Sequence, residues 1–393
     1  MSGRPALLLP VADGSLQGFV PSGRVIEVTP VEGFTSRVAF AAAHVVPDAL
    51  ADNAPGRPAV LDWDSTLAFR DYLWSLGFGV AEAMDTAQRG MGLDWSTSSE
   101  LIRRSAARAG QRGGRIAAGV GTDQLPPGEH TLDAVVAAYT EQMEVAEQAG
   151  AQVILMASRA MVTAAESPDD YAKVYGRMLE QASQPVVLHW LGAAFDPALT
   201  GYWGSSDLDT AAEAVLALIA DHADRIDGIK VSLLDSGREV ALRRRLPSGV
   251  RLYTGDDFNY PELIAGDGVG DHPHSDALLG VFAAIAPAAS AALVALDGGD
   301  RDAFCAVLEP TVPLARHLFG EPTYYYKTGI AFLAWLNGHQ PAFTMVGGLH
   351  TGRSLPHLAQ VLRLADVAGV LTDPDLATSR MRHLLAVHGV DQP

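Results

Sequence analysis

Lys230 is the residue of this sequence that is best suited to covalent chemistry. It lies in the stretch RIDGIKVSLLD (residues 225–235), where apolar residues surround it. The chain has 28 lysines and arginines, and only three of them, Lys173, Lys230 and Lys327, are lysines. Because arginine supplies almost all of the positive charge, a lysine in an apolar run indicates a role that arginine cannot fill. An amine can lose its proton and attack a carbonyl carbon, whereas a guanidinium group stays protonated.

The spacing around Lys230 predicts a β-strand that presents the amine to the interior of a barrel. Side chains alternate across a strand, so Lys230 shares a face with Gly228 and Ser232, and the intervening residues are apolar. In a low dielectric, desolvation lowers the pKa of an amine, which can then form a Schiff base with a ketone or aldehyde. The alternative is a lysine that reaches solvent from a strand edge or pairs with a buried aspartate.

Short apolar runs that alternate with helical segments predict the elements that hold Lys230. Parallel sheets with covering helices produce this alternation, and an eighth strand would close a (β/α)₈ barrel. The main alternative is an open doubly wound sheet, but no G-x-G-x-x-G follows an early strand. The expected strands lie within residues 37–45, 78–84, 115–121, 152–158, 185–190, 228–234, 250–255 and 275–282.

The chain is predicted to have three parts. Residues 1–36 are rich in glycine and proline with short β-prone pieces, and they predict an N-terminal β arm. Residues 37–282 form the barrel, and the strand signal stops at about residue 283, so residues 283–393 are predicted to be a C-terminal helical domain. Within the barrel, Thr131 and Ser98 are the expected N-caps of two helices.

Polar side chains at the predicted strand ends supply candidate substrate-binding residues. Function in a (β/α)₈ barrel sits at the C-terminal ends of the strands and in the loops that follow them. Asp256 and Asp257 are suited to orient substrate hydroxyls or, alternatively, to cap the next helix. Arg159 is suited to clamp a carboxylate or phosphate, or to form a surface ion pair. The full set is Asp85, Thr86, Ser158, Arg159, Ser232, Asp256 and Asp257.

His189 is the predicted proton carrier. It lies on the strand before that of Lys230, and an imidazole exchanges protons near neutral pH. The alternative is a core histidine bound to a backbone carbonyl. We predict no cofactor and no metal, because the sequence lacks H-E-x-x-H and a facial-triad cluster, and the DHPH loop at 271–274 is expected to be solvated. A scattered metal site made of Glu82, His189 and Asp256 stays open.

Composition excludes several classes of protein. A net charge of −18 argues against nucleic acid and anionic membrane surfaces as partners. The single cysteine, Cys305, excludes an internal disulfide and a multi-cysteine metal site. The apolar run near the amino terminus is shorter than a signal peptide requires, and no run approaches the length of a membrane span. We therefore expect a cytoplasmic protein.

The order of IAAGVG, VILMAS, PVVLHW, GIKVSLLD and YTGDD resembles the dihydrodipicolinate synthase and N-acetylneuraminate lyase superfamily. GIKVSLLD is similar to the strand-six segment whose lysine forms the Schiff base, and this implies that role for Lys230. YTGDD resembles the turn after strand seven. The stretch EPTYYYKTGI is similar to the start of the last long helices. More narrowly, the whole chain looks like a branch of that superfamily, the domain-of-unknown-function group numbered 993.

Three departures from the superfamily pattern concern the substrate. The usual glycine-threonine-threonine turn that grips pyruvate reads AMDTAQ here, where Thr86 remains and Asp85 replaces a threonine. His189 replaces the strand-five tyrosine that relays protons, and the following loop lacks the carboxylate-binding arginine. The resemblance therefore implies Schiff-base chemistry without implying pyruvate. An aspartate at position 85 favours a substrate with hydroxyl groups.

The leading hypothesis is a class I lyase, either an aldolase or a dehydratase, that acts on a keto acid or a sugar-derived ketone. Lys230 would form the imine and His189 would move the proton. The alternatives are a metal-dependent aldolase or isomerase without an imine, and a non-catalytic protein that binds sugar acids. The partner is expected to be a small carbonyl compound, and the resemblance implies a homodimer or homotetramer.

Overall fold

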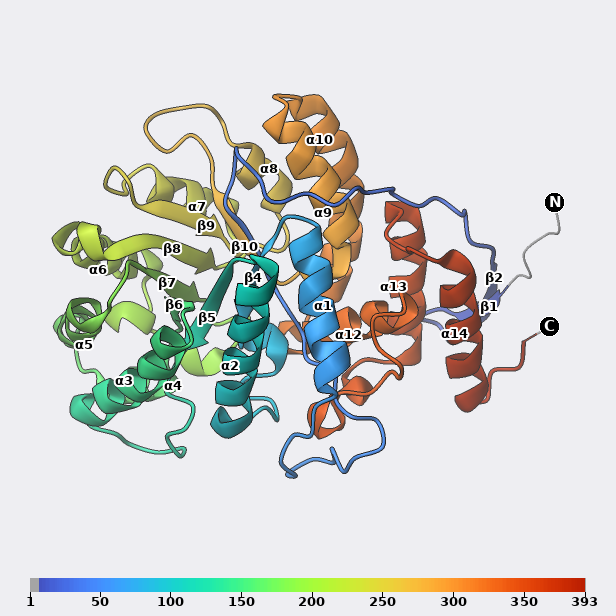
Figure 1. The fold of residues 1–393 in the computed structure, drawn as a ribbon, viewed down its shortest axis with the longest axis horizontal. Coiled ribbons are helices and arrows are strands. Elements are labelled where there is room, and N and C mark those ends of the chain that lie inside the picture. The colour runs from blue at the N-terminus through green and yellow to red at the C-terminus, as the bar shows by residue number, and fades with distance from the viewer. Residues whose placement is uncertain (1–6, 393) are drawn as a thin grey trace.

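The fold, known from a computed structural model that describes residues 7–392, is built on a closed barrel of eight parallel strands. The strands pair in the order β10-β3-β4-β5-β6-β7-β8-β9 (Figure 1). The predicted (β/α)₈ barrel is therefore confirmed, and each predicted run contains or overlaps one barrel strand. These strands are β3 (Ala39–Ala42), β4 (Gly79–Glu82), β5 (Ile116–Val120), β6 (Gln152–Leu155), β7 (Val186–Leu191), β8 (Ile226–Ser232), β9 (Arg251–Thr254) and β10 (Asp276–Leu279).

Helices connect successive strands and cover the outside of the barrel (Figure 1). They are α1 (Trp63–Ser75), α2 (Trp95–Arg112), α3 (Leu132–Gln148), α4 (Arg159–Ala164), α5 (Pro168–Gln181), α6 (Leu208–Asp221), α7 (Ser236–Arg243) and α8 (Tyr260–Ala265). Short 3₁₀ turns lie in the loops, namely η1 (Asp85–Ala87), η2 (Pro197–Leu199), η3 (Tyr202–Gly204) and η4 (Ala223–Arg225). No helix within residues 7–392 is long and apolar enough to cross a membrane.

The helix caps explain where two of these helices begin. Thr131 caps α3 as predicted, because its side chain accepts a hydrogen bond from the Ala134 amide at 3.2 Å. The prediction that Ser98 caps α2 is wrong. Asp94 caps that helix and accepts from the Thr97 amide at 2.7 Å, so Ser98 lies inside the first turn. An aspartate four residues upstream has the same capping chemistry, and the sequence alone did not separate the two positions.

After the last strand, the chain forms only helices among the described residues. They are α9 (Phe282–Asp297), α10 (Arg301–Leu308), α11 (Val312–Leu318), α12 (Tyr326–Leu336), α13 (Leu355–Ala368) and α14 (Pro374–Val387), with the turns η5 (Glu309–Thr311), η6 (Thr323–Tyr325) and η7 (Val346–Gly352). Helices α12, α13 and α14 lie beside the barrel (Figure 1). The boundaries proposed at residues 36 and 282 stay a prediction.

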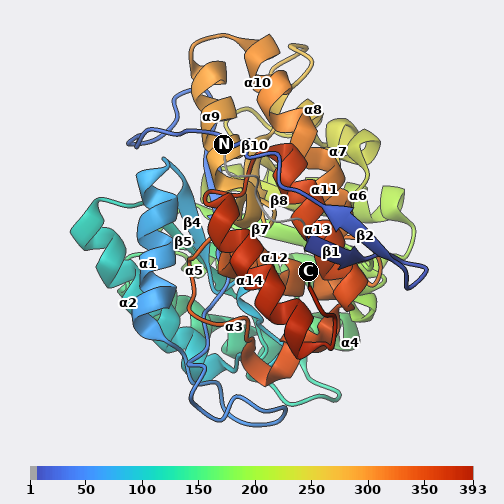
Figure 2. The same cartoon turned by 90° about the vertical axis from the view of Figure 1, so that its right-hand side faces the viewer.

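The start of the described chain is an antiparallel hairpin of β1 (Leu7–Pro10) and β2 (Leu16–Phe19). It lies against α13 and α14, so the two ends of the chain meet on the same side of the molecule (Figure 2). Residues 1–6, the beginning of the predicted arm, lie outside the described residues.

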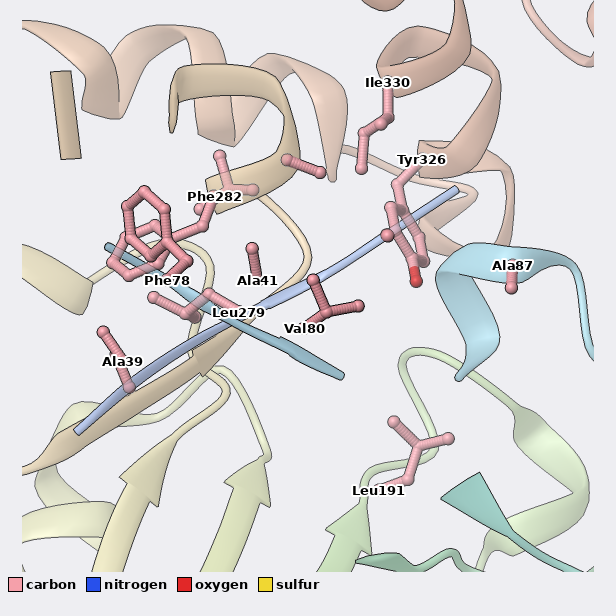
Figure 3. Close-up of a cluster of buried hydrophobic side chains, with 14 of the residues drawn as sticks. Ala39, Ala41, Phe78, Val80, Ala87, Leu191, Leu279, Phe282, Tyr326 and Ile330 are labelled. Atoms are coloured by element: carbon pink, nitrogen blue, oxygen red, sulfur yellow. The ribbon is translucent and has the colours of Figure 1, made fainter. Parts of the chain in front are cut away.

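Two layers of apolar side chains surround the barrel strands. One layer lies between strands and helices, and it includes Phe282 and Ile330 from the C-terminal helices beside Ala41 and Val80 of the barrel (Figure 3). The other fills the barrel interior and consists of Phe40, Ala42, Ala81, Met84, Ala117, Ile154, Met156, Val187, Tyr253 and Leu278. The interior is thus a packed core, as is usual for this kind of barrel.

Candidate active site

Lys230 points into the barrel, as the strand alternation predicted. Its register neighbours are His189 of β7 and Tyr253 of β9, while Ile229 and Val231 pack outward against the helices. The side chain is buried, with 8% of its surface exposed. Its amino group makes no hydrogen bond or ion pair with any residue of 7–392, and it borders a cavity instead. A buried, unpartnered amine is uncommon because burying a charge is costly.

The cavity beside Lys230 is small and enclosed by residues from several elements. Its volume is about 10 Å³, which is room for about one water molecule. The lining residues are Met84, Asp85, Thr86, Leu191, Phe195, Lys230, Ser232, Asp257, Gly280 and Tyr326. The structure therefore brings Lys230 together with four of the predicted substrate-binding residues, namely Asp85, Thr86, Ser232 and Asp257.

Burial and opposite charge control the ionisation of Lys230 and Asp257. Burial lowers the pKa of the Lys230 amine, and the charges of Asp85 and Asp257 oppose that shift. Burial raises the pKa of Asp257 to about 7, while a hydrogen bond from the Val281 amide at 2.9 Å and the charge of Lys230 act in the opposite direction. Burial thus favours the uncharged form of both groups, which is the form that an attacking amine and a proton-donating carboxyl need.

His189 does not border this cavity. Its Nε2 lies 3.3 Å from the Ser232 hydroxyl, and its Nδ1 has no hydrogen-bond partner among the described residues. Burial, with the charge of Lys230 adding to it, holds the pKa of His189 well below its usual value. The ring is therefore neutral and reaches the cavity only through Ser232. This position does not fit the predicted role of direct proton carrier, because Ser232 separates the imidazole from the space a substrate would enter.

Asp256 and Asp257 are adjacent in sequence but have different roles. The Asp256 carboxylate accepts hydrogen bonds from the amides of Phe258 and Asn259 at 2.9 and 3.0 Å, and from the Asn259 side chain at 2.8 Å. It holds the turn before α8 and does not line the cavity. These contacts agree with the capping alternative for Asp256, and Asp257 is the aspartate of this pair that lines the cavity beside Lys230.

A second, larger cavity of about 380 Å³ lies outside the first. We call it the outer cavity and the one beside Lys230 the inner cavity. Asp85 and Leu191 line both, so they form the wall between them. Ser158 and Arg159 line only the outer cavity. The predicted site residues that line a cavity thus divide into an inner group at Lys230 and an outer group, Ser158 and Arg159, that follows β6.

Local contacts hold Ser158 and Arg159, the two predicted residues that line the outer cavity, in place. The Ser158 hydroxyl caps α4 by accepting from the Met161 amide at 3.0 Å, and it lies 2.6 Å from the Thr122 hydroxyl. The Arg159 guanidinium binds Asp196 at 2.5 Å with about half of its side chain exposed. Arg159 therefore links the loops after β6 and β7, as the surface-ion-pair alternative predicted.

Sequence reasoning missed the contribution of the C-terminal helices. Tyr326, which Figure 3 shows at the start of α12, lines the inner cavity. Its hydroxyl lies 2.9 Å from that of Thr86. Its ring stacks on Phe319 and meets Phe195 edge-on, so Tyr326 and Phe195 line the cavity and Phe319 supports the Tyr326 ring. The run of three tyrosines before Lys327 was the available signal, but it does not show which ring faces the barrel.

The residues considered for a scattered metal site do not gather. Glu82 points outward and pairs with Arg70 at 2.8 Å, His189 lies behind Ser232, and Asp256 holds its turn. Within residues 7–392, no group of three or more histidine, cysteine or acidic side chains is arranged to hold a metal ion.

Comparison with known proteins establishes the family and the fold. A family model described as "Protein of unknown function (DUF993)" matches residues 7–390, and the chain belongs to this family. No curated protein sequence matches the chain significantly.

Solved structures of dihydrodipicolinate synthases share the fold at low sequence identity. The enzyme from Bacillus clausii matches with a TM-score of 0.62 and 15% identity over 84% of this chain and 97% of its own. The 4-hydroxy-tetrahydrodipicolinate synthase of Methylacidiphilum fumariolicum SolV gives 0.60 and 16% over 88% and 99%. The synthase from Aquifex aeolicus gives 0.58 and 12% over 91% and 99%.

Proposed function

We propose that this protein is a class I lyase in which Lys230 forms an imine with a ketone substrate. The observation that carries the proposal is the buried Lys230 amine, which has no hydrogen-bond partner among the described residues and faces the inner cavity. Desolvation makes such an amine nucleophilic. The fold shared with dihydrodipicolinate synthases supports the choice of reaction class.

The first stage is imine formation. The Lys230 nitrogen attacks the carbonyl carbon and passes one of its protons to the carbonyl oxygen, which becomes a hydroxyl and leaves as water when it gains a second proton. Asp257 borders the same cavity, and its raised pKa lets it carry a proton at neutral pH. It donates that proton to the departing oxygen and becomes a carboxylate, which then stabilises the iminium cation.

The second stage uses the iminium as an electron sink. In C–C cleavage the β-hydroxyl loses its proton and becomes the carbonyl of the released fragment, while the electron pair of the broken bond moves toward the iminium nitrogen and gives an enamine. In a dehydration the pair comes from the α C–H bond, and the enamine then expels the β-hydroxyl, which is protonated and leaves as water. The Asp257 carboxylate is the base that takes or returns the proton. Asp85, Thr86 and Tyr326 surround the rest of the inner cavity and supply polar contacts for a keto acid or a sugar-derived ketone.

Borohydride trapping tests the imine. The protein is incubated with candidate keto acids and keto sugars and reduced, and its peptides are mapped by mass spectrometry. We expect a stable adduct on Lys230 that is absent from Lys230→Arg. Lys173→Arg is the matched control, because Lys173 lies exposed on α5 with Asp170 as partner and should leave the adduct unchanged. Turnover without any adduct on Lys230, or an active Lys230→Arg variant, would contradict the imine mechanism.

A further inference from the structure

The outer cavity is positioned to hold the part of a substrate that does not react. It adjoins the inner cavity through Asp85 and Leu191, so a ketone whose carbonyl reaches Lys230 would extend into it. Its volume of about 380 Å³ lies in the range of small-molecule sites. The segments that follow β4, β5, β6 and β7 form its walls, and side chains from these segments determine which groups it accepts.

The cations that line the outer cavity are already paired. Arg89 binds Asp123 through its Nε at 2.9 Å and also donates to the carbonyl of Gly119 at 3.0 Å. Arg159 binds Asp196 at 2.5 Å. Asp123 and Asp196 therefore offset the charge of these cations before a carboxylate or phosphate enters, although the contact of Arg159 uses only its Nε. Each arginine also links two loops, so displacing its partner would cost structural order as well as charge pairing.

The Asp85 carboxylate is the charged group of this cavity that has no hydrogen-bond or ion-pair partner among the described residues. Lys327 interacts electrostatically with Asp85 but lines neither cavity. The Lys327 amine packs over the rings of Tyr324 and Tyr326 and donates to the Tyr324 carbonyl at 3.4 Å. Burial lowers the pKa of Lys327 to about 8, and the charge of Asp85 opposes that shift. This cation offsets the charge of Asp85 without offering a contact to a ligand in the cavity.

Neutral hydroxyl groups complete the polar surface. The hydroxyls of Thr122 and Ser158 lie at the same wall, 2.6 Å apart, and both are buried. A hydroxyl group both donates and accepts hydrogen bonds, and a free carboxylate accepts them. The complementary ligand is rich in donors and carries no negative charge.

We infer that the outer cavity binds an uncharged, polyhydroxylated chain, so that the substrate is a neutral polyhydroxy ketone and Asp85 accepts a hydrogen bond from a hydroxyl near the carbonyl. This inference rests on the proposed imine mechanism and narrows its substrate class. It excludes a keto acid or a phosphorylated ketone as the preferred substrate, because either anion would face the unpartnered Asp85 carboxylate, while Asp123 and Asp196 already offset the charge of the two arginines.

The test compares probes that differ in charge. Dihydroxyacetone and erythrulose are the neutral probes, and dihydroxyacetone phosphate and pyruvate are the anionic ones. Each is trapped on the full-length protein with cyanoborohydride at the same concentration, and the rate of adduct formation on Lys230 is measured. We expect at least about tenfold faster labelling by the neutral ketones, the size of effect that one charge-assisted hydrogen bond gives.

Asp85→Asn tests the residue itself, because it removes the charge and keeps an acceptor oxygen. We expect the preference for neutral over anionic probes to fall by about tenfold in this variant. The matched control is Asp224→Asn, which removes the same charge from an exposed position before β8, at the opposite end of the barrel. Its preference should equal that of the unaltered protein. Thermal unfolding of both variants shows whether they are folded.

The outcomes separate the two proposals. Faster labelling of Lys230 by pyruvate or by dihydroxyacetone phosphate would overturn the inference and leave the imine mechanism standing. An unchanged preference in folded Asp85→Asn would overturn the role of Asp85. Absence of a Lys230 adduct with every probe would overturn the imine mechanism and this inference with it.

Discussion

Gly255 lies directly against Lys230 at the point where β9 ends. A Cβ atom added at residue 255 would lie 2.8 Å from the Lys230 Cε and 2.2 Å from the Ser232 hydroxyl. The Val231 carbonyl, which accepts a hydrogen bond from the Gly255 amide at 2.8 Å, would be 2.9 Å away. Since the backbone contact fixes one side, a larger residue here must move the lysine or the serine. The absence of a side chain at residue 255 thus sets the position of the Lys230 amine.

Gly255→Ala is therefore expected to misplace the amine. Imine formation should fall by about a hundredfold, since a shift of about 1 Å has effects of this size, and stability should fall by about 1–3 kcal/mol from overpacking. Trapping rates and urea unfolding measure the two effects. Gly110→Ala in α2 is the control, because an added Cβ meets nothing within 4 Å there. A Gly255→Ala variant that labels at the normal rate would show that Lys230 does not depend on this contact.

The pH dependence of imine formation is expected to report Asp257. Burial raises the pKa of Asp257 to about 7, so its proton is present below that pH and is lost above it. If Asp257 protonates the departing oxygen, trapping should slow as the pH rises through about 7. In Asp257→Asn the amide does not titrate, so this alkaline decrease should vanish. The rate at about pH 6 should fall by about a hundredfold, as for loss of a general acid.

The measurement is the trapping rate of both proteins across this pH range with one neutral ketone. An alkaline decrease of the same midpoint in Asp257→Asn would assign the titration to another group. Asp85 and Lys230 border the same cavity. The pH profile of Asp85→Asn shows how much of the alkaline decrease depends on Asp85.

The barrel and the placement of Lys230 were predictable because both depend on local patterns. Apolar runs separated by amphipathic segments specify parallel strands, and the two-residue period of a strand specifies which way Lys230 points. The same apolar runs indicate where each strand ends, and the residues predicted at those ends, Asp85, Thr86 and Ser232, do lie beside the lysine.

The parts that were not predictable depend on turn geometry and on contacts between distant residues. Asp256 and Asp257 are chemically identical and adjacent, and only the turn before α8 decides which one faces the cavity. His189 was placed on the correct strand, but the position of Ser232 between it and the cavity could not be read from spacing. Tyr326 lies 240 positions from its partner Thr86, beyond the reach of any local pattern.

The separate roles of the two aspartates give a further prediction. Asp256→Ala removes the acceptor for the Phe258 and Asn259 amides, so the free energy of unfolding should fall by about 1–2 kcal/mol, as for a lost cap. Imine formation per folded molecule should fall far less than in Asp257→Asn. Urea unfolding and trapping, performed on both variants, distinguish the roles. A larger loss of trapping in Asp256→Ala would place its carboxylate in the site.

The hydrogen bond between Thr86 and Tyr326 joins the barrel to α12 beside the inner cavity. Thr86→Val and Tyr326→Phe each remove one hydroxyl and leave the other buried without its partner, so each should cost about 1–3 kcal/mol of unfolding free energy. The double variant removes both groups and should cost less than the sum, with a coupling energy of about 0.5–3 kcal/mol. Urea unfolding of the four proteins gives this value.

The same four proteins show whether the bond matters for the chemistry. Because the Tyr326 ring covers the cavity and stacks on Phe319, Tyr326→Phe preserves the cover, and trapping on Lys230 should persist at a reduced rate. Tyr326→Ala removes the cover and should slow trapping further by admitting water, which strengthens solvation of the amine and raises its pKa toward the usual value. Equal trapping rates in Tyr326→Phe and Tyr326→Ala would mean that the ring does not shield Lys230. A coupling energy of zero between Thr86→Val and Tyr326→Phe would mean that the two hydroxyls do not hold α12 to the barrel.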